Sequence, residues 1–181
     1  MRARTPRSLV PLIAAWLLSC GGPQAAPGPR GGSSVPDFAV DDTAGNEFRM
    51  AEHVGNSVLL LNFWATSCEP CRLEMPHLHR LQQSYRDNGL RILAVSMDGP
   101  ESMAEVRSRV SRYDFSFTVL LDVDSEVTRL YNPRRAAPFN VLVDRSGTIA
   151  WTHEGYSAGD EVELERRIRD ALGLEATPSQ S

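Results

Sequence analysis

The chain has 181 residues, of which 41% are hydrophobic and 23% are charged, and its formal net charge is −4. This length and composition suit one globular domain with a proper core, and they exclude a fibrous or largely disordered chain. All 19 basic residues are arginines and they form no basic run, so nothing indicates nucleic-acid binding. The three cysteines, Cys20, Cys68 and Cys71, are too few for a disulfide-stapled domain, and the odd number indicates that one has a separate role.

Residues 1–19 have the pattern of a signal peptide. Three arginines precede a short apolar segment at residues 9–18, well below the roughly 20 residues that span a bilayer. The following LLSC sequence resembles the lipobox of bacterial lipoproteins, which implies cleavage before Cys20 and attachment of lipid to its sulfur. The alternatives are an ordinary signal peptide that is cut further on and an uncleaved membrane anchor.

Two segments have compositions that cannot form a core. Residues 20–34 are rich in Gly, Pro, Ala and Ser and are predicted to be a flexible tether, and residues 174–181 are predicted to be a disordered tail. Cleavage before Cys20 removes three arginines and no acid, which changes the net charge from −4 to −7. We therefore expect the lipid, rather than charge, to hold the protein at a membrane.

Residues 35–173 are predicted to form one domain in which strands and helices alternate. Segments 38–40 and 47–49 predict a small leading hairpin. The continuous apolar run SVLLLNFW at 57–64 is typical of a strand buried on both faces. A helix is expected from residue 69 to about residue 88, where an Asn-Gly pair breaks it. The residues that share one face of this helix are Cys71, Glu74, Leu78, Leu81 and Tyr85.

The second half of the domain continues this alternation. We expect strands at 91–97 and 117–121, a hairpin of 139–144 with 148–153, and a last helix at 160–172. A helix from about residue 100 should turn Met103, Val106, Val110 and Tyr113 inward, and a short helix at 125–131 should bury Val127, Leu130 and Tyr131. The prediction is an α/β fold with a central mixed sheet, helices on both faces and an N-terminal β-hairpin extension.

The stretch NFWATSCEPCRLEMP at 62–76 places two cysteines at the junction between a buried strand and the next helix. Free backbone N–H groups at a helix start stabilise an anion, so a Cys68 thiolate is favoured there. Two intervening residues let the sulfurs form and reopen a disulfide with little backbone movement. We expect Cys68 to be the exposed attacking thiol and Cys71, one turn inside, to be the buried resolving thiol.

The same stretch closely resembles the active site of the thioredoxin superfamily. The branch that it resembles is the membrane-tethered, extracytoplasmic TlpA/ResA type, which serves cytochrome c maturation and related thiol reduction. The resemblance extends over most of residues 35–173 and implies a thioredoxin-like fold. It also implies that Pro138 is a cis proline beside the dithiol, which holds substrate backbone and blocks stray metal binding. Pro76 matches the helix-kinking proline of the family.

Glu74 lies three residues after Cys71, on the expected buried face of the helix. A buried carboxylate is costly when charged, so the pKa of Glu74 should rise, and beside Cys71 it could take and return the thiol proton. The resemblance implies the same role. The alternative is a solvated acid at the edge of the helix.

Four more residues are expected around the substrate. Trp64 is predicted in the core or at the rim of the site, and Glu69 should tune the reduction potential by its charge. Most relatives have Trp where Ser67 stands and Thr where Phe139 stands, so these two positions leave the identity of the substrate open.

We expect no metal and no cofactor. Zinc normally takes four ligands and the chain has no second cysteine pair, while a c-type haem would need His where Arg72 stands. His77 and His79 are expected to be solvated helix residues.

The predicted function is thiol–disulfide exchange outside the cytoplasm, directed to the reduction of protein disulfides, with apocytochrome c as a substrate suggested by the resemblance. The expected partners are protein disulfide substrates, a membrane thiol-reductant donor and, through Cys20, the bacterial envelope membrane on its periplasmic or extracytoplasmic side. One alternative is a peroxiredoxin-like thiol peroxidase, which would have Thr or Ser where Ala65 stands. The other is a non-catalytic tethered binding domain. A reductase and an oxidase share these residues and differ in reduction potential.

Overall fold

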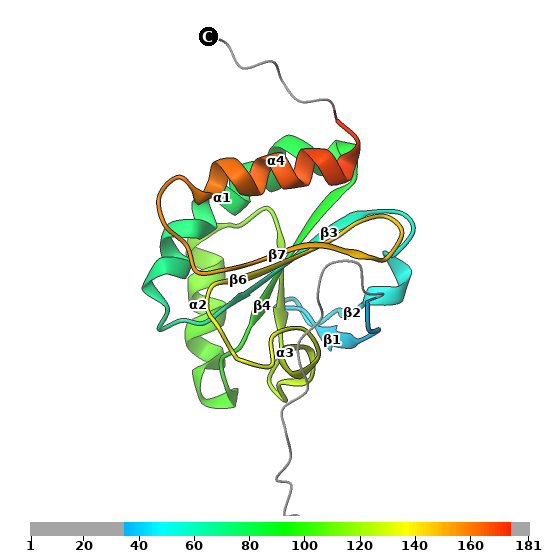
Figure 1. Ribbon diagram of the computed structural model, residues 1–181. Helices are drawn as coiled ribbons and strands as arrows, with labels where there is room; N and C mark the ends of the chain where they lie inside the picture. The colour runs from blue at the N-terminus through cyan, green and yellow to red at the C-terminus, as the bar shows by residue number, and fades with distance from the viewer. Residues whose placement is uncertain (1–34, 175–181) are drawn as a thin grey trace, which may run out of the picture.

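The computed structural model describes residues 35–174, and a five-stranded sheet forms its centre (Figure 1). The strand order is β5-β4-β3-β6-β7. Strands β3, β4 and β5 are parallel, whereas β6 and β7 are antiparallel to their neighbours, which confirms the predicted mixed sheet. The strands are β3 (Val58–Trp64), β4 (Leu90–Ser96), β5 (Thr118–Leu121), β6 (Phe139–Val143) and β7 (Ile149–Glu154).

Helices cover both faces of this sheet. Alternate side chains of each strand point to opposite sides, so a strand of apolar residues presents an apolar surface on each face. On one face, Leu60 of β3 packs in a core that includes residues of three helices: α1 (Glu69–Tyr85), α2 (Met103–Tyr113) and α4 (Asp160–Leu172). On the other face, Leu59 and Leu61 pack in a core with α3 (Glu126–Tyr131) and the predicted hairpin of β1 (Ala39–Asp41) and β2 (Glu47–Arg49). Three short 3-10 helices complete the chain: η1 (Met50–Glu52), η2 (Arg86–Asn88) and η3 (Pro100–Ser102).

Two side chains that were predicted to face the core are exposed. Tyr113 is the last residue of α2 and is 55% exposed, because the chain leaves the helix at Asp114 in a left-handed conformation. The Tyr113 ring stacks on Phe115 instead. Leu130 is 38% exposed, because the six-residue helix α3 buries a narrow face made of Val127, Thr128 and Tyr131. The predicted inward faces of both helices were therefore wrong at these positions.

Several sequence predictions fall on segments 1–34 and 175–181, which lie outside the described residues. These are the signal peptide, the tether with Cys20 and most of the predicted tail. Within residues 35–174, no helix combines the length and the apolar character that a membrane crossing requires.

Gln82 of α1 is buried and completes the hydrogen bonding of β4. Strand β5 pairs with β4 only from Leu93 onward, so the first residues of β4 need another partner. Gln82 Nε2 donates to the Leu90 carbonyl at 3.1 Å, and Gln82 Oε1 accepts from the Ile92 N–H at 2.6 Å. One amide thus satisfies two buried backbone groups and joins α1 to the sheet.

We predict that Gln82→Leu lowers the free energy of unfolding by about 2–3 kcal/mol, because a buried donor and a buried acceptor lose their partner. The exposed neighbour Gln83 supplies the control, and Gln83→Leu should change stability by less than about 0.5 kcal/mol. Urea unfolding of both variants and the wild type measures these differences. Equal stability of the two variants would show that Gln82 is not needed to satisfy β4.

Candidate active site

The two cysteines lie where β3 passes through a short loop into α1. Cys68 is the N-cap of α1, with extended backbone angles, and its Sγ accepts a hydrogen bond from the Cys71 N–H at 3.2 Å. Pro70 occupies the first turn, where its missing N–H leaves no backbone donor unused. Because the other N–H groups of this turn point out of the helix start, negative charge on Cys68 Sγ is favoured.

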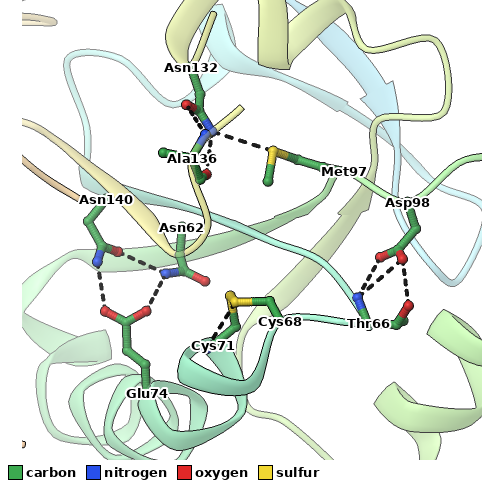
Figure 2. Close-up of a disulfide and its surroundings, with 10 residues drawn as sticks. All are labelled: Asn62, Thr66, Cys68, Cys71, Glu74, Met97, Asp98, Asn132, Ala136 and Asn140. Carbon is green, nitrogen blue, oxygen red and sulfur yellow. Dashed lines mark hydrogen bonds between the residues drawn. A yellow bond between two sulfur atoms is a disulfide. The ribbon is translucent and has the colours of Figure 1, made fainter. Parts of the chain in front are cut away.

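Cys68 and Cys71 form a disulfide (Figure 2), and the two residues differ in exposure. Cys71 is 1% exposed and belongs to the core beneath α1, whereas Cys68 is half-buried. A thiol or disulfide that approaches from outside can therefore reach Cys68 but not Cys71. This is the order of access that the spacing predicts.

Asp98 holds the loop that precedes Cys68. It follows β4, is 9% exposed, and its Oδ1 accepts from the Thr66 hydroxyl at 2.6 Å. Its Oδ2 accepts from the Thr66 N–H at 3.0 Å and from the Ser96 hydroxyl at 2.9 Å. The loop backbone is thus tied to the end of β4 two residues before the reactive sulfur. This carboxylate was not predicted from the sequence.

Glu74 lies in a cluster with two asparagines (Figure 2). Only 2% of it is exposed. Asn62 Nδ2 donates to Glu74 Oε2 at 2.8 Å, and Asn140 Nδ2 donates to Glu74 Oε1 at 2.7 Å. Asn62 Nδ2 also donates to Asn140 Oδ1 at 2.9 Å. The two asparagines are direct partners in the antiparallel pairing of β3 with β6, so the sheet presents both amides to α1.

Burial raises the pKa of the Glu74 carboxyl to about 7, and the hydrogen bonds from Asn140 and Asn62 lower it only in part. His153 and Asp160 act on it with opposite signs, His153 lowering the pKa and Asp160 raising it. The carboxyl therefore changes its charge near neutral pH, which is the condition for efficient proton transfer. Glu74 is three residues from Cys71 on the same helix face.

The asparagine pair was missed in the sequence, although a signal was present. Asn62 interrupts the apolar run of β3, and Asn140 does the same in β6. A polar side chain in a strand buried on both faces needs a buried hydrogen-bond partner. That argument points to a polar cluster, but only the strand register shows that the partners are each other and Glu74.

The peptide bond between Ala137 and Pro138 is cis, as the resemblance implied. Pro138 directly precedes β6, and Phe139 pairs with Phe63 at the end of β3. This register places Pro138 at the edge of the sheet from which the dithiol loop leaves. The preceding loop is held by Asn132, whose Nδ2 contacts Met97 Sδ at 3.4 Å and donates to the Ala136 carbonyl at 2.8 Å (Figure 2).

The four other predicted substrate contacts have different settings. Trp64 is 1% exposed at the end of a strand buried on both faces, which confirms the core as one of its two predicted settings and corrects the expectation that it contacts the substrate. Ser67 and Glu69 are exposed beside the disulfide, and Glu69 pairs with Arg72. Phe139 is half-buried, with its ring tilted on Phe63 at 6.2 Å.

The histidines of α1 are half-buried rather than fully solvated. His79 Nδ1 accepts from the Ser116 N–H at 3.0 Å, and the His77 ring lies 5.8 Å from that of Tyr156. Over residues 35–174, no three side chains of the metal-binding types come together.

Comparisons with known proteins agree with this geometry. The sequence matches the AhpC/TSA family over residues 32–152. It is 33% identical over 132 residues to the thiol-disulfide oxidoreductase ResA of Geobacillus kaustophilus, which covers 73% of this chain and 74% of that protein. It is 35% identical over 133 residues to the thioredoxin-like protein YneN of Bacillus subtilis, covering 73% and 76%.

A crystal structure of a proposed thiol:disulfide interchange protein DsbE from Chlorobium tepidum has the same fold, with a TM-score of 0.72 and 32% identity. The likeness covers 80% of this chain and 99% of that one. The fold and the cysteine pair thus define a thioredoxin-like thiol–disulfide oxidoreductase. The chain belongs to the AhpC/TSA family, and among its relatives are the ResA thiol–disulfide oxidoreductases.

The charge of Glu74 makes stability depend on pH. Between the ordinary value of 4.5 and about 7, the folded protein keeps a proton on Glu74 that the unfolded chain releases, so stability falls as the pH rises through this window. We predict that this group lowers the free energy of unfolding by about 3 kcal/mol between these limits, and that Glu74→Gln lacks the contribution. Urea unfolding of the oxidised proteins at pH 5 and pH 8 measures the difference; the same pH dependence in both would contradict it.

The amide of Asn140 should hold the pKa of Glu74 down. Asn140→Ala removes the hydrogen bond that lowers this pKa most, so we predict that the pKa of Glu74 rises above its value of about 7. Titration of the side-chain carboxyl by ¹³C NMR measures the change. Asn88→Ala, at an exposed position in η2, is the control and should leave the titration unaltered. A lower pKa in Asn140→Ala would mean that the amide does not stabilise the carboxylate.

Proposed function

We propose that the protein is a lipid-anchored, extracytoplasmic reductase of protein disulfides. The observation that carries the proposal is the pairing of an accessible Cys68 with a buried Cys71 and a buried carboxyl whose pKa is about 7. A resolving thiol in the core cannot lose its proton to solvent, so a carboxyl on the same helix face is the group that can accept it.

The first step is the attack of the Cys68 thiolate on one sulfur of the substrate disulfide. A bond forms between Cys68 Sγ and that sulfur, the substrate disulfide breaks, and the other substrate sulfur leaves as a thiolate that takes a proton from water. The helix start favours the attacking anion, and the exposed position of Ser67 leaves the approach open.

In the second step, Cys71 gives its proton to the Glu74 carboxylate and attacks Cys68 Sγ. The Cys68–Cys71 disulfide forms, the mixed disulfide breaks, and the second substrate sulfur leaves as a thiolate that takes a proton from water. Glu74 holds the proton of Cys71 and returns it when the disulfide is reduced again. Two electrons have then passed from the dithiol to the substrate, and the protein is in the oxidised state that the structure shows. Pro138, which is buried, and the half-buried Phe139 lie at the sheet edge beside the dithiol loop, and the backbone at these two residues is the proposed contact for the substrate backbone.

The proposal includes partners and a location. A membrane thiol-reductant donor returns two electrons to the disulfide after each turnover, and a lipid on Cys20 holds the domain at the envelope membrane. The signal-peptide pattern supports the proposed anchor, and the similarity to thiol-disulfide oxidoreductases supports the proposed electron donor. The resemblance to the cytochrome c maturation branch extends the proposed substrates to apocytochrome c.

We predict that Cys71→Ser accumulates covalent complexes with substrate proteins, because the mixed disulfide on Cys68 is no longer resolved. Cys68→Ser, the matched control, forms no such complexes and reduces insulin at less than about 1% of the wild-type rate, since it lacks the attacking sulfur. Non-reducing electrophoresis after alkylation measures the complexes, and mass spectrometry identifies the trapped proteins. The absence of any Cys71→Ser complex would argue against the exchange mechanism.

A peroxide-consumption assay on the same preparations tests the rival activity. Wild-type protein that consumes peroxide without reducing insulin would favour the thiol peroxidase, and neither activity would favour a binding domain. Disulfide reduction without peroxide turnover is the expected result.

A further inference from the structure

A small basic pocket lies between the start of α1 and helix α2. Its volume is about 200 Å³, and it is lined by Arg72, Glu105, Ser108, Arg109, Arg112 and Tyr113. Three arginines face one carboxylate there, although the whole chain carries a net charge of −4. The pocket is therefore a local region of positive charge on an acidic protein.

Two of these guanidinium groups have unused donors. Arg109 pairs with Glu105 through Nη2 at 2.8 Å, but its Nη1 is buried and has no hydrogen-bond acceptor among the described residues. Arg112 has neither an ion pair nor a hydrogen bond within residues 35–174. The unpaired donor that a carboxylate in the pocket can reach is the guanidinium of Arg112, which is exposed.

The pocket is close to the reactive disulfide. Arg72 directly follows Cys71, and its N–H donates to the Cys68 carbonyl at 3.4 Å in the first turn of α1. The Arg72 side chain pairs with Glu69, the residue between Cys68 and Pro70. Arg72 therefore links the lining of this pocket to the helix turn that begins at Cys68.

We propose that this pocket binds an acidic side chain, Asp or Glu, of the protein whose disulfide is reduced at Cys68. The inference rests on the proposed reductase function and adds a substrate preference to it. The cavity is smaller than the roughly 300–1,000 Å³ of most small-molecule sites, so it suits one side chain of a larger partner. The Tyr113 ring, 55% exposed and stacked on Phe115 at 5.4 Å, supplies an apolar wall beside the arginines.

Two oxidised peptides test this preference. They share one sequence with a single internal disulfide, and one has two Glu near the cysteines where the other has two Gln. The full chain, with its dithiol reduced, is mixed with each peptide at low ionic strength, and the rate of peptide reduction is measured. We expect the Glu peptide to react roughly ten-fold faster, as a charged hydrogen bond to Arg would give.

Variants locate the effect in the pocket. Arg112→Gln and Arg109→Gln should bring the ratio of the two rates toward one, with the Gln peptide as the internal reference for folding and chemistry. Arg86→Gln is the matched control, because Arg86 is also an exposed arginine at the end of a helix, far along α1 from Cys68. It should keep the wild-type ratio. Added salt should reduce the ratio in the wild type and in this control.

The outcomes separate this inference from the proposed function. If wild type reduces both peptides at equal rates, or if Arg112→Gln keeps the preference, the acidic-residue site is wrong while the reductase stands. If wild type reduces neither peptide, the reductase function itself fails. Binding to phosphatidylglycerol vesicles that is lost in Arg112→Gln, with an unchanged peptide ratio, would assign the pocket to lipid headgroups and overturn the inference.

Discussion

The hydrogen bonds from Asn62 and Asn140 to Glu74 are the interaction on which the rest of the site depends. They join helix α1 to two strands at the level of the dithiol, and they keep a carboxyl in the core that would otherwise be costly to bury. The amides lower the pKa of Glu74 less than burial raises it, so the carboxyl titrates near 7 rather than remaining permanently charged or neutral. This is the behaviour that the proposed proton transfer from Cys71 to Glu74 requires.

The reactive sulfur is positioned from several sides by separate parts of the sheet. Asp98, after β4, holds the loop before Cys68, while the first turn of α1 supplies N–H groups at the sulfur. The cis peptide at Pro138 enters β6 on the same edge. Strands β3 and β4 end, and β6 begins, at the same end of the sheet. Asp98, the dithiol loop and Pro138 therefore lie together there. The basic pocket at the start of α1 extends this edge toward α2.

Local patterns predicted most of the architecture. The buried run of β3 and the helix that follows it were found from hydrophobic periodicity, and α4 begins and ends at the predicted residues. Helix faces were less predictable. Tyr113 continued the apolar spacing of α2, but the helix ends there, and its ring stacks on Phe115 instead of entering the core. Trp64 was expected in the core or at the rim of the site, and because its strand is covered on both faces it lies in the core.

The sequence by itself indicated the chemistry: two cysteines separated by two residues at a helix start can form and reopen a disulfide with little backbone movement. It also placed Glu74 one turn beyond Cys71, because helix periodicity is local. Only the tertiary structure decided how that carboxyl behaves. Asn62 and Asn140 are 78 residues apart, and the antiparallel register of β3 with β6 brings them together. The pKa of Glu74 depends on burial and on these long-range partners, which local spacing cannot specify.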